Sequence, residues 1–368
     1  MLKRIYANNY RCLVNFDTDL DRLTLLVGPN GGGKSTLFDL LLKIRYLIVD
    51  NAKVADVFPQ SDCTAWITKA SQSFELDVLG RHGLYSYKLV LSQDQDFNKQ
   101  HVEIEELLID GKPLLEFRRG EVALFRDDNK AGAQYSFDSS VSALATIAPR
   151  QDNNKLIWFK NWLKNLFILN LHPKGMTSES REESDWLNHN GTNFASWYRF
   201  ISQEYQDKIF GLTEELREVL PGFHAFKLEL AGKHRILKAG FVGEDSSSTP
   251  IYFDFEQLSD GQRTLIVLYG LMLGLREMGH TIFIDEPDNY IALTEIQPWL
   301  MDLSDACADG FSQAVLISHH PELIDYLGPE CGKWIERDPL GPARIKKLPE
   351  RIGKGLKLSE QIARGWTE

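Results

Sequence analysis

A glycine-rich loop between a strand and a helix constrains this sequence more than any other feature. Residues 28–35 read Gly-Pro-Asn-Gly-Gly-Gly-Lys-Ser, which satisfies the pattern GxxxxGK[ST]. An apolar run at residues 23–27 precedes the loop, and residues 35–48 have the apolar periodicity of a helix. Glycines let backbone N–H groups turn inward around phosphates, and a helix N-terminus adds partial positive charge. The segment therefore predicts an α/β nucleotide-binding fold.

Individual residues of this loop predict contacts with ATP and Mg²⁺. Lys34 can reach the β- and γ-phosphates, Ser35 can ligate Mg²⁺, and Thr36 is expected at the α-phosphate. The remaining contacts are expected from the loop residues Asn30, Gly31, Gly32 and Gly33. Average composition gives the pattern by chance in about one chain in a hundred of this length, and the strand–helix context lowers that figure further.

A second strand ends in two carboxylates. Residues 280–287 read His-Thr-Ile-Phe-Ile-Asp-Glu-Pro, and such a strand of a parallel sheet delivers its last residues to the sheet edge where a phosphate loop lies. Asp285 is expected to hold Mg²⁺, through water, and Glu286 to polarise the attacking water as a general base. Taken alone, the same pair also fits helix capping.

Two further motifs complete the candidate site. Residues 258–262 read Leu-Ser-Asp-Gly-Gln at the start of a predicted helix, where Ser259 and Gln262 form the pattern of a capping box. The Ser259 hydroxyl and the N–H groups near Gly261 also suit a γ-phosphate, but one bound to a different subunit. A strand at residues 314–317 leads to two histidines, of which His319 is expected to contact the γ-phosphate and His320 is a rival.

These four motifs, in this order, resemble the ABC-type ATPases. The resemblance implies an α/β P-loop fold with a mixed, mainly parallel sheet, an antiparallel β subdomain and an inserted α/β lobe. It also implies a homodimer or higher homo-oligomer in which the phosphate loop of one subunit and the signature of the other enclose ATP. We expect a single domain over residues 1–368, with a phosphate-loop lobe (1–72), an inserted β and helical region (73–250) and a signature lobe (251–368).

Within this family the chain resembles the RecF/SMC/OLD branch more than transporter ATPases. Residues 7–13 resemble the opening motif of that branch, and Lys34 lies further from Ser259 than in transporters. Residues 285–290, 317–322 and 359–366 resemble small stand-alone bacterial ATPases of the AAA family, without the C-terminal nuclease module of OLD proteins. Three positions depart from the pattern: Asp260 replaces the usual glycine, Asn289 fits a D-loop only loosely, and the Q-loop glutamine is left open between Gln60 and Gln72.

The rest of the sequence predicts several further elements. Alternating runs between residues 73 and 138 predict antiparallel strands with a turn at Asp110-Gly111, and residues 225–242 predict a hairpin. Residues 194–219 have the period of one helix of roughly seven turns, too short for the long coiled-coil arms of chromosome-organising ATPases. The polar residues 176–190 predict a surface loop. Strands are expected at 3–7, 22–27, 252–255 and 281–285, and helices at 259–278 and 293–302.

Composition limits the compartment and the partners. The formal net charge of −11 argues against a generally basic, nucleic-acid-coating surface, while residues 339–368 hold a local excess of basic residues for which a solvated surface is the simpler interpretation. Four scattered cysteines fit free thiols in a reducing cytoplasm. The sequence has no apolar run of the roughly 18 residues that a membrane helix needs, and its first residues do not resemble a signal peptide.

Three functions are compatible with these motifs. The first is an ATP-driven dimer switch linked to DNA or RNA, which controls an effector such as a nuclease from a neighbouring gene in phage defence or repair. The second is the ATPase subunit of a membrane transporter. The third is a nucleotide-gated scaffold that scarcely hydrolyses ATP, against which the presence of Glu286 argues.

Overall fold

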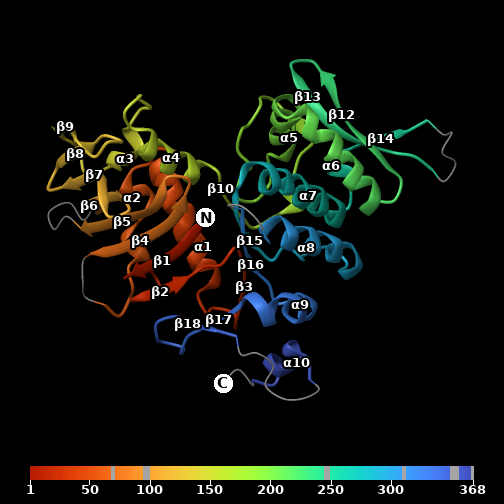
Figure 1. Ribbon diagram of the computed structural model, residues 1–368. Coiled ribbons are helices and arrows are strands. Elements are labelled where there is room, and N and C mark those ends of the chain that lie inside the picture. Colours follow the sequence, from red (N-terminus) through yellow and green to blue (C-terminus); the bar gives the residue numbers. More distant parts are fainter. Residues whose placement is uncertain (68–70, 94–99, 244–248, 309–311, 349–355, 366–368) are drawn as a thin grey trace. The chain divides into compact units, whose positions relative to one another are not determined.

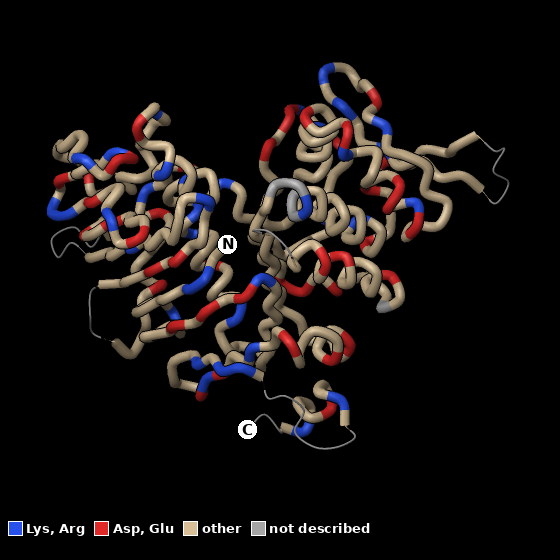
Figure 2. Tube along the Cα trace, in the orientation of Figure 1, with Lys and Arg blue, Asp and Glu red and all other residues tan. Residues whose placement is uncertain are grey.

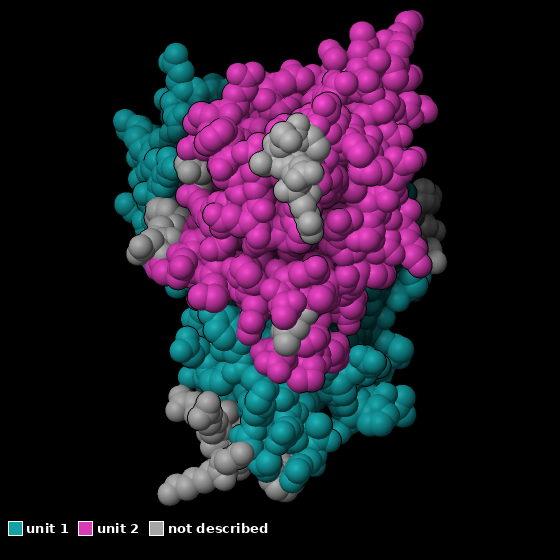
Figure 3. Space-filling model, turned by 90° about the vertical axis from the view of Figure 1, so that its right-hand side faces the viewer, with its two compact units in different colours: residues 1–166, 323–368 teal, residues 167–322 magenta. Residues whose placement is uncertain are grey.

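The chain forms two compact units. The computed structural model describes residues 1–67, 71–93, 100–243, 249–308, 312–348 and 356–365. Unit 1 consists of residues 1–166 and 323–368, and unit 2 consists of residues 167–322 (Figure 3).

An eight-stranded antiparallel sheet forms much of unit 1 (Figure 1). Its strands, in spatial order, are β2 (Phe16–Asp19), β1 (Leu2–Asn8), β4 (Gln72–Gly80), β5 (Gly83–Gln93), β6 (Gln100–Ile109), β7 (Lys112–Arg118), β8 (Glu121–Phe125) and β9 (Ala131–Ser136). Burial alternates residue by residue along β4, because successive side chains of a strand point to opposite faces. The predicted turn joins β6 to β7, with Asp110 at φ 47° and Gly111 at φ 75°. The antiparallel region predicted between residues 73 and 138 is therefore confirmed.

A second set of strands in unit 1 carries the phosphate loop. Strand β3 (Leu23–Val27) is followed by residues 28–33 and then by helix α1 (Lys34–Val49). β3 pairs in parallel with β17 (Gly332–Glu336), which pairs antiparallel with β18 (Arg344–Lys347). Four of the five β3 residues are buried, as expected of a continuous apolar run.

The helices of unit 1 cover these strands with apolar side chains. They are α1, α2 (Val54–Val57), the 3-10 turn η1 (Gln60–Asp62), α3 (Ala143–Thr146), α4 (Asn154–Lys164), most of α9 (Pro321–Cys331) and α10 (Leu358–Ala363). Helix α1 buries most of its leucines and isoleucines and contacts α2, α3 and α4. The rings of Tyr10, Phe58 and Phe74 pack together with centroids 5.4 to 6.2 Å apart.

Unit 2 contains the strand that ends in the two carboxylates. Strands β10 (Leu166–Leu169), β15 (Thr281–Asp285) and β16 (Gln313–Ile317) lie in that order. β15 and β16 are parallel, with Asp285 opposite Ile317. Every residue of β15 and β16 is buried. Because the two strands are parallel and in register, they end at the same edge of the sheet.

The rest of unit 2 is a small antiparallel sheet with helices. β11 (Glu179–Ser180) and β14 (Ile251–Asp254) pair with β13 (His234–Phe241), which pairs with β12 (Phe223–Ala231). The helical elements are η2 (Pro173–Gly175), α5 (Phe194–Glu204), α6 (Gln206–Val219), η3 (Phe255–Gln257), α7 (Asp260–Met278) and α8 (Leu293–Ala308). The indole N–H of Trp299 in α8 donates to the Leu268 carbonyl of α7 over 3.2 Å.

The single helix predicted over residues 194–219 is wrong in one respect. Tyr205, at φ −129° and ψ 50°, ends α5 and starts α6. Its N–H still bonds to the Ile201 carbonyl and its own carbonyl accepts from Lys208 and Ile209. Because the apolar spacing continues through this position, periodicity could not show the break in the backbone.

Charged residues of both signs are interspersed along the trace (Figure 2). In the basic C-terminal segment, Lys346 pairs with Glu336 at 3.2 Å and Lys357 with Asp325 at 3.7 Å. Arg351 and Lys354 of that segment lie outside the described residues. No described helix is long and apolar enough to cross a membrane.

Candidate functional site

The phosphate loop has backbone angles that only glycine adopts readily. Gly28, Gly31 and Gly33 have φ angles of 152°, 77° and 112°. A Cβ atom on Gly28 would lie 1.9 Å from the Ile335 carbonyl oxygen, and one on Gly32 would lie 2.8 Å from the same atom. The glycines therefore allow both the turn of the loop and its close approach to β17.

The side chains predicted to bind nucleotide lie in this loop and in the first turn of α1. The ammonium of Lys34 is buried and donates to the carbonyls of Gly28, at 2.8 Å, and Pro29, at 3.1 Å. Asn30 and Ser35 are exposed, and Thr36 is half-buried. Positive φ angles, a helix N-terminus and an amine inside the loop together fit a triphosphate with Mg²⁺.

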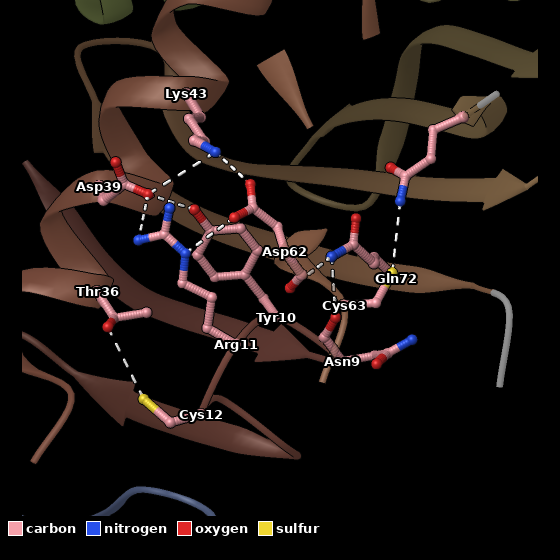
Figure 4. Close-up of polar contacts among 11 residues, drawn as sticks. Asn9, Tyr10, Arg11, Cys12, Thr36, Asp39, Lys43, Asp62, Cys63 and Gln72 are labelled. Atoms are coloured by element: carbon pink, nitrogen blue, oxygen red, sulfur yellow. Dashed lines mark hydrogen bonds and ion pairs between the residues drawn. The ribbon is translucent and has the colours of Figure 1, made fainter. Parts of the chain in front are cut away.

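A polar cluster holds the segment before the loop against α1 (Figure 4). Arg11 donates from Nε to Asp62 at 2.9 Å and pairs with Asp39 of α1 at 3.0 Å. Lys43, one turn further along α1, pairs with Asp62, and the Tyr10 hydroxyl donates to Asp39. Burial, and then Asp39, raise the pKa of Tyr10. This cluster fixes residues 9–12 beside the phosphate loop.

The opening motif also contacts the loop directly. The thiol of Cys12 donates to the Thr36 hydroxyl at 3.8 Å, and a Cβ on Gly33 would lie 3.0 Å from the Cys12 sulfur. Sequence reasoning named residues 7–13 but missed their partners Asp39 and Asp62. The spacing of Asp39 and Lys43 on one helical face was the available signal.

The two candidates for the Q-loop differ in burial. Gln72 is fully buried, and its amide nitrogen donates to the Asn9 carbonyl at 2.9 Å and to the Asp62 carbonyl at 3.4 Å. Gln60 is exposed in η1. Gln72 therefore supports the opening segment, and the exposed Gln60 is the better placed of the two to meet solvent or ligand.

In unit 2, the end of β15 presents the two carboxylates. Asp285 is buried at the last position of the strand, and Glu286 follows with φ 53°, a left-handed conformation that is uncommon for a side chain of this kind. The Glu286 N–H donates to the Ile317 carbonyl at 2.8 Å, and its carboxylate accepts from the Asn289 amide at 2.7 Å. These bonds fix the Glu286 backbone to β16 and its carboxylate to Asn289.

Two histidines follow β16, the neighbouring strand. His319 is exposed, whereas His320 is half-buried and its Nδ1 accepts from the Glu322 N–H at 3.2 Å. The His320 N–H donates to the Ser318 hydroxyl at 2.9 Å. Because Asp285 lies opposite Ile317, the histidines leave the sheet at the same edge as Glu286.

Asp288 also lies at this edge of the sheet, and the sequence motifs did not single it out as a site residue. Burial raises the pKa of its carboxyl group, and a hydrogen bond with Ser318 opposes that rise. Only its place two residues after Glu286 could have pointed to it.

The signature segment begins α7 with the predicted capping box. The Ser259 hydroxyl accepts from the Gln262 N–H at 3.2 Å, and the Gln262 side chain accepts from the Ser259 N–H at 3.0 Å. Ser259 is exposed, and Gly261 lies where a Cβ would be 2.6 Å from the Tyr290 carbonyl oxygen. The segment after Glu286 therefore packs directly on the signature glycine.

The candidate residues fall into two groups. The phosphate-loop residues 30–36 lie together in unit 1, and Asp285, Glu286, His319, Ser259, Gly261 and Gln262 lie in unit 2.

Comparison with known proteins settles the family. The profile described as "AAA domain, putative AbiEii toxin, Type IV TA system" matches residues 23–325, which is most of the chain. The chain belongs to this AAA family. This family match supports an ATPase of the AAA type and therefore nucleotide binding.

One curated protein and two solved structures are also similar to this chain. A segment of 111 residues is 32% identical to part of the OLD nuclease of Thermus scotoductus. This segment is 29% of this chain and 20% of that protein. The chain thus spans about a fifth of that relative. The fold is similar to the SMC head domain from Thermotoga maritima, with a TM-score of 0.50, 14% identity and coverage of 95% and 99% of the two chains. It is also similar to an SMC head bound to the C-terminal winged-helix domain of ScpA, with a TM-score of 0.54, 11% identity and coverage of 94% and 97%.

Proposed function

We propose that this AAA-family protein hydrolyses ATP, with the phosphate loop of one subunit and the signature helix of another enclosing each nucleotide. The observation that carries the proposal is the conformation of Glu286, which directly follows Asp285 and is held by a backbone bond to β16 and by Asn289. A glutamate with a left-handed backbone conformation at the end of a buried strand costs conformational free energy, and such backbone strain clusters at functional sites.

Each residue has a role that follows from its chemistry. Lys34 and the loop N–H groups bind the phosphates, while Ser35 and Asp285 would hold Mg²⁺. Mg²⁺ bound with the nucleotide would neutralise charge on the phosphates. Glu286 accepts a proton from the attacking water, and His319 contacts the γ-phosphate. Ser259, Gly261 and Gln262 meet that phosphate from the other subunit.

The exposure of the signature supports a site shared between subunits. Ser259 lies on the surface with its hydroxyl at the start of α7, where a helix N-terminus favours an anion. The capping box uses the hydroxyl oxygen as an acceptor, so its proton remains available to a phosphate.

A Glu286→Gln variant tests the chemical role. We expect ATP turnover to fall by at least about a hundredfold, the usual contribution of a general base, while ATP binding persists. Glu295→Gln is the matched control, since Glu295 is an exposed carboxylate of α8 in the same unit and accepts from the Ala292 N–H at 3.2 Å. Equal turnover by the wild type and Glu286→Gln would reject Glu286 as the base, whereas ATP binding with scarcely any turnover by the wild type would favour a nucleotide-gated scaffold.

The biological use of this cycle is proposed from the relatives. The matched segment of an OLD nuclease and the SMC head fold favour a switch in DNA- or RNA-linked defence or repair, acting through an effector protein. A nucleic acid, added with or without the product of the neighbouring gene, should change the ATP turnover rate. A rate that stays constant under all these conditions would refute the nucleic-acid link and leave the ATPase proposal intact.

A further inference from the structure

The turn between β17 and β18 packs along the phosphate loop in unit 1. The Ile335 carbonyl lies against Gly28 and Gly32, and the Ala343 side chain lies where a Cβ on Gly33 would be 3.1 Å away. The Ala343 N–H donates to the Cys12 carbonyl at 2.8 Å. Both ends of this turn are therefore fixed against the loop or the segment before it, although the turn is more than 300 residues away in sequence.

Arg337 of this turn lies close to Gly31 in the middle of the loop. Its terminal guanidinium nitrogen is 3.9 Å from the position of a Cβ on Gly31, whose φ of 77° belongs to the phosphate-wrapping turn. The Arg337 side chain is exposed, and it has no ion pair with any residue in the described part of the chain. An arginine in this position holds its donors beside the loop without a carboxylate to bind them.

The neighbouring basic residues are engaged elsewhere. Lys346 pairs with Glu336 at 3.2 Å, and Arg344 donates to the Val14 and Ala343 carbonyls at 3.3 Å. Arg11, on the other side of the loop, pairs with Asp39 and Asp62. These partners neutralise or orient those three cations, whereas the Arg337 guanidinium lies beside Gly31 and can turn to an anion there.

We propose that Arg337 binds the phosphate chain of ATP from the same subunit that supplies the phosphate loop. A guanidinium presents a planar fork of N–H donors that matches phosphate oxygens, and its charge-assisted bonds are stronger than those of neutral donors. The site thus contains a cation contributed by the C-terminal hairpin as well as Lys34. This inference rests on the proposed ATP site and adds a residue to it.

The test measures the affinity of the full-length protein for a fluorescent ATP analogue in the presence of Mg²⁺. We expect Arg337→Ala to weaken binding roughly tenfold, the factor given by one lost charge-assisted contact, and Arg337→Lys to have an intermediate effect. Lys346→Ala removes one positive charge from the same hairpin away from the loop and should bind as the wild type does. Equal thermal unfolding midpoints for these variants show that the fold is kept.

Competition with unlabelled tripolyphosphate shows which part of the nucleotide Arg337 contacts. We expect Arg337→Ala to weaken tripolyphosphate and ATP by the same factor. A loss for ATP alone would place the arginine at the base or ribose and overturn the proposal, and unchanged affinity for both ligands would also overturn it. If the wild-type protein binds neither ligand, and Lys34→Ala behaves in the same way, the proposed ATP site is rejected. This outcome differs from the one that rejects only the role of Arg337, in which the wild type binds ATP and Arg337→Ala binds it equally well.

Discussion

Glu105 shows how one buried carboxylate joins a strand to a helix. Its side chain is fully buried in unit 1 and accepts from the hydroxyls of Tyr87 at 2.9 Å and Ser142 at 2.6 Å, and from the Ala143 N–H at 2.7 Å. Burial raises the pKa of Glu105, and these hydrogen bonds oppose the rise. The carboxylate therefore accepts hydrogen bonds from the N-terminus of the short helix α3. Nothing in the local sequence pattern predicts this contact.

The raised pKa gives a prediction about pH. Because the folded-state pKa lies above the ordinary value of 4.5, the protonated form is favoured by folding, and this stabilisation is greatest below pH 4.5. It is lost as the pH rises through the folded-state pKa. Chemical denaturation of the wild type and of Glu105→Gln at several pH values measures this contribution to the free energy of unfolding. The stability advantage of the wild type should shrink as pH rises from 4.5, and an advantage that grows would contradict the assignment.

Gly261 gives a second prediction at the level of one residue. A methyl group there would lie 2.6 Å from the Tyr290 carbonyl oxygen, which is backbone and cannot rotate away. We expect Gly261→Ala to lower the free energy of unfolding by about 1–3 kcal/mol, the usual cost of overpacking. Urea denaturation measures this cost. The matched control is Gly211→Ala, because a Cβ at Gly211 in helix α6 meets nothing within 4 Å, and this variant should not destabilise the protein.

At the level of elements, α4 packs on the antiparallel sheet through a tight contact at Gly80. The Trp158 ring lies where a Cβ on Gly80 would be 2.4 Å away, and it stacks on Tyr85 with centroids 4.8 Å apart. We expect Gly80→Ala to destabilise the protein by about 1–3 kcal/mol. Adding Trp158→Leu should recover part of the loss, as a double-mutant cycle followed by urea denaturation would show. Strictly additive losses would mean that the two residues do not share this contact.

Elements with a strong local signal were the ones that sequence predicted well. The glycine-rich loop, the apolar strand of residues 281–285 and the hairpin around Gly232 all occur where expected, because each depends on nearby residues. The break at Tyr205 and the contact of the β17–β18 turn with the phosphate loop were not predictable. The first leaves the apolar period unchanged, and the second joins residues that are more than 300 positions apart.

The candidate site also has features that local motifs predict and features that depend on the fold. The chemical types of Lys34, Asp285 and Glu286 follow from motifs, whereas the left-handed backbone of Glu286, its bond to Asn289 and the position of Arg337 depend on the folded chain. Motifs therefore predict which groups are candidates for the chemistry, and the structure adds how these groups are held.

At the scale of the whole molecule, we propose an ATP site that two subunits share. Lys34→Ala removes the phosphate-loop cation, and Ser259→Arg fills the signature position, so each variant alone should lack ATP turnover. A heterodimer of the two contains one site built from an intact loop and an intact signature. Random pairing of equal amounts should therefore restore about a quarter of wild-type turnover per subunit.

Steady-state ATP turnover of this equimolar mixture is the most direct measurement of the shared site. We expect turnover well above the sum of the two variants measured alone, and near a quarter of the wild-type value. A mixture of Lys34→Ala with Lys34→Ala/Ser259→Arg serves as the control and should stay inactive. If the first mixture shows no more turnover than its separate components, the shared site is contradicted.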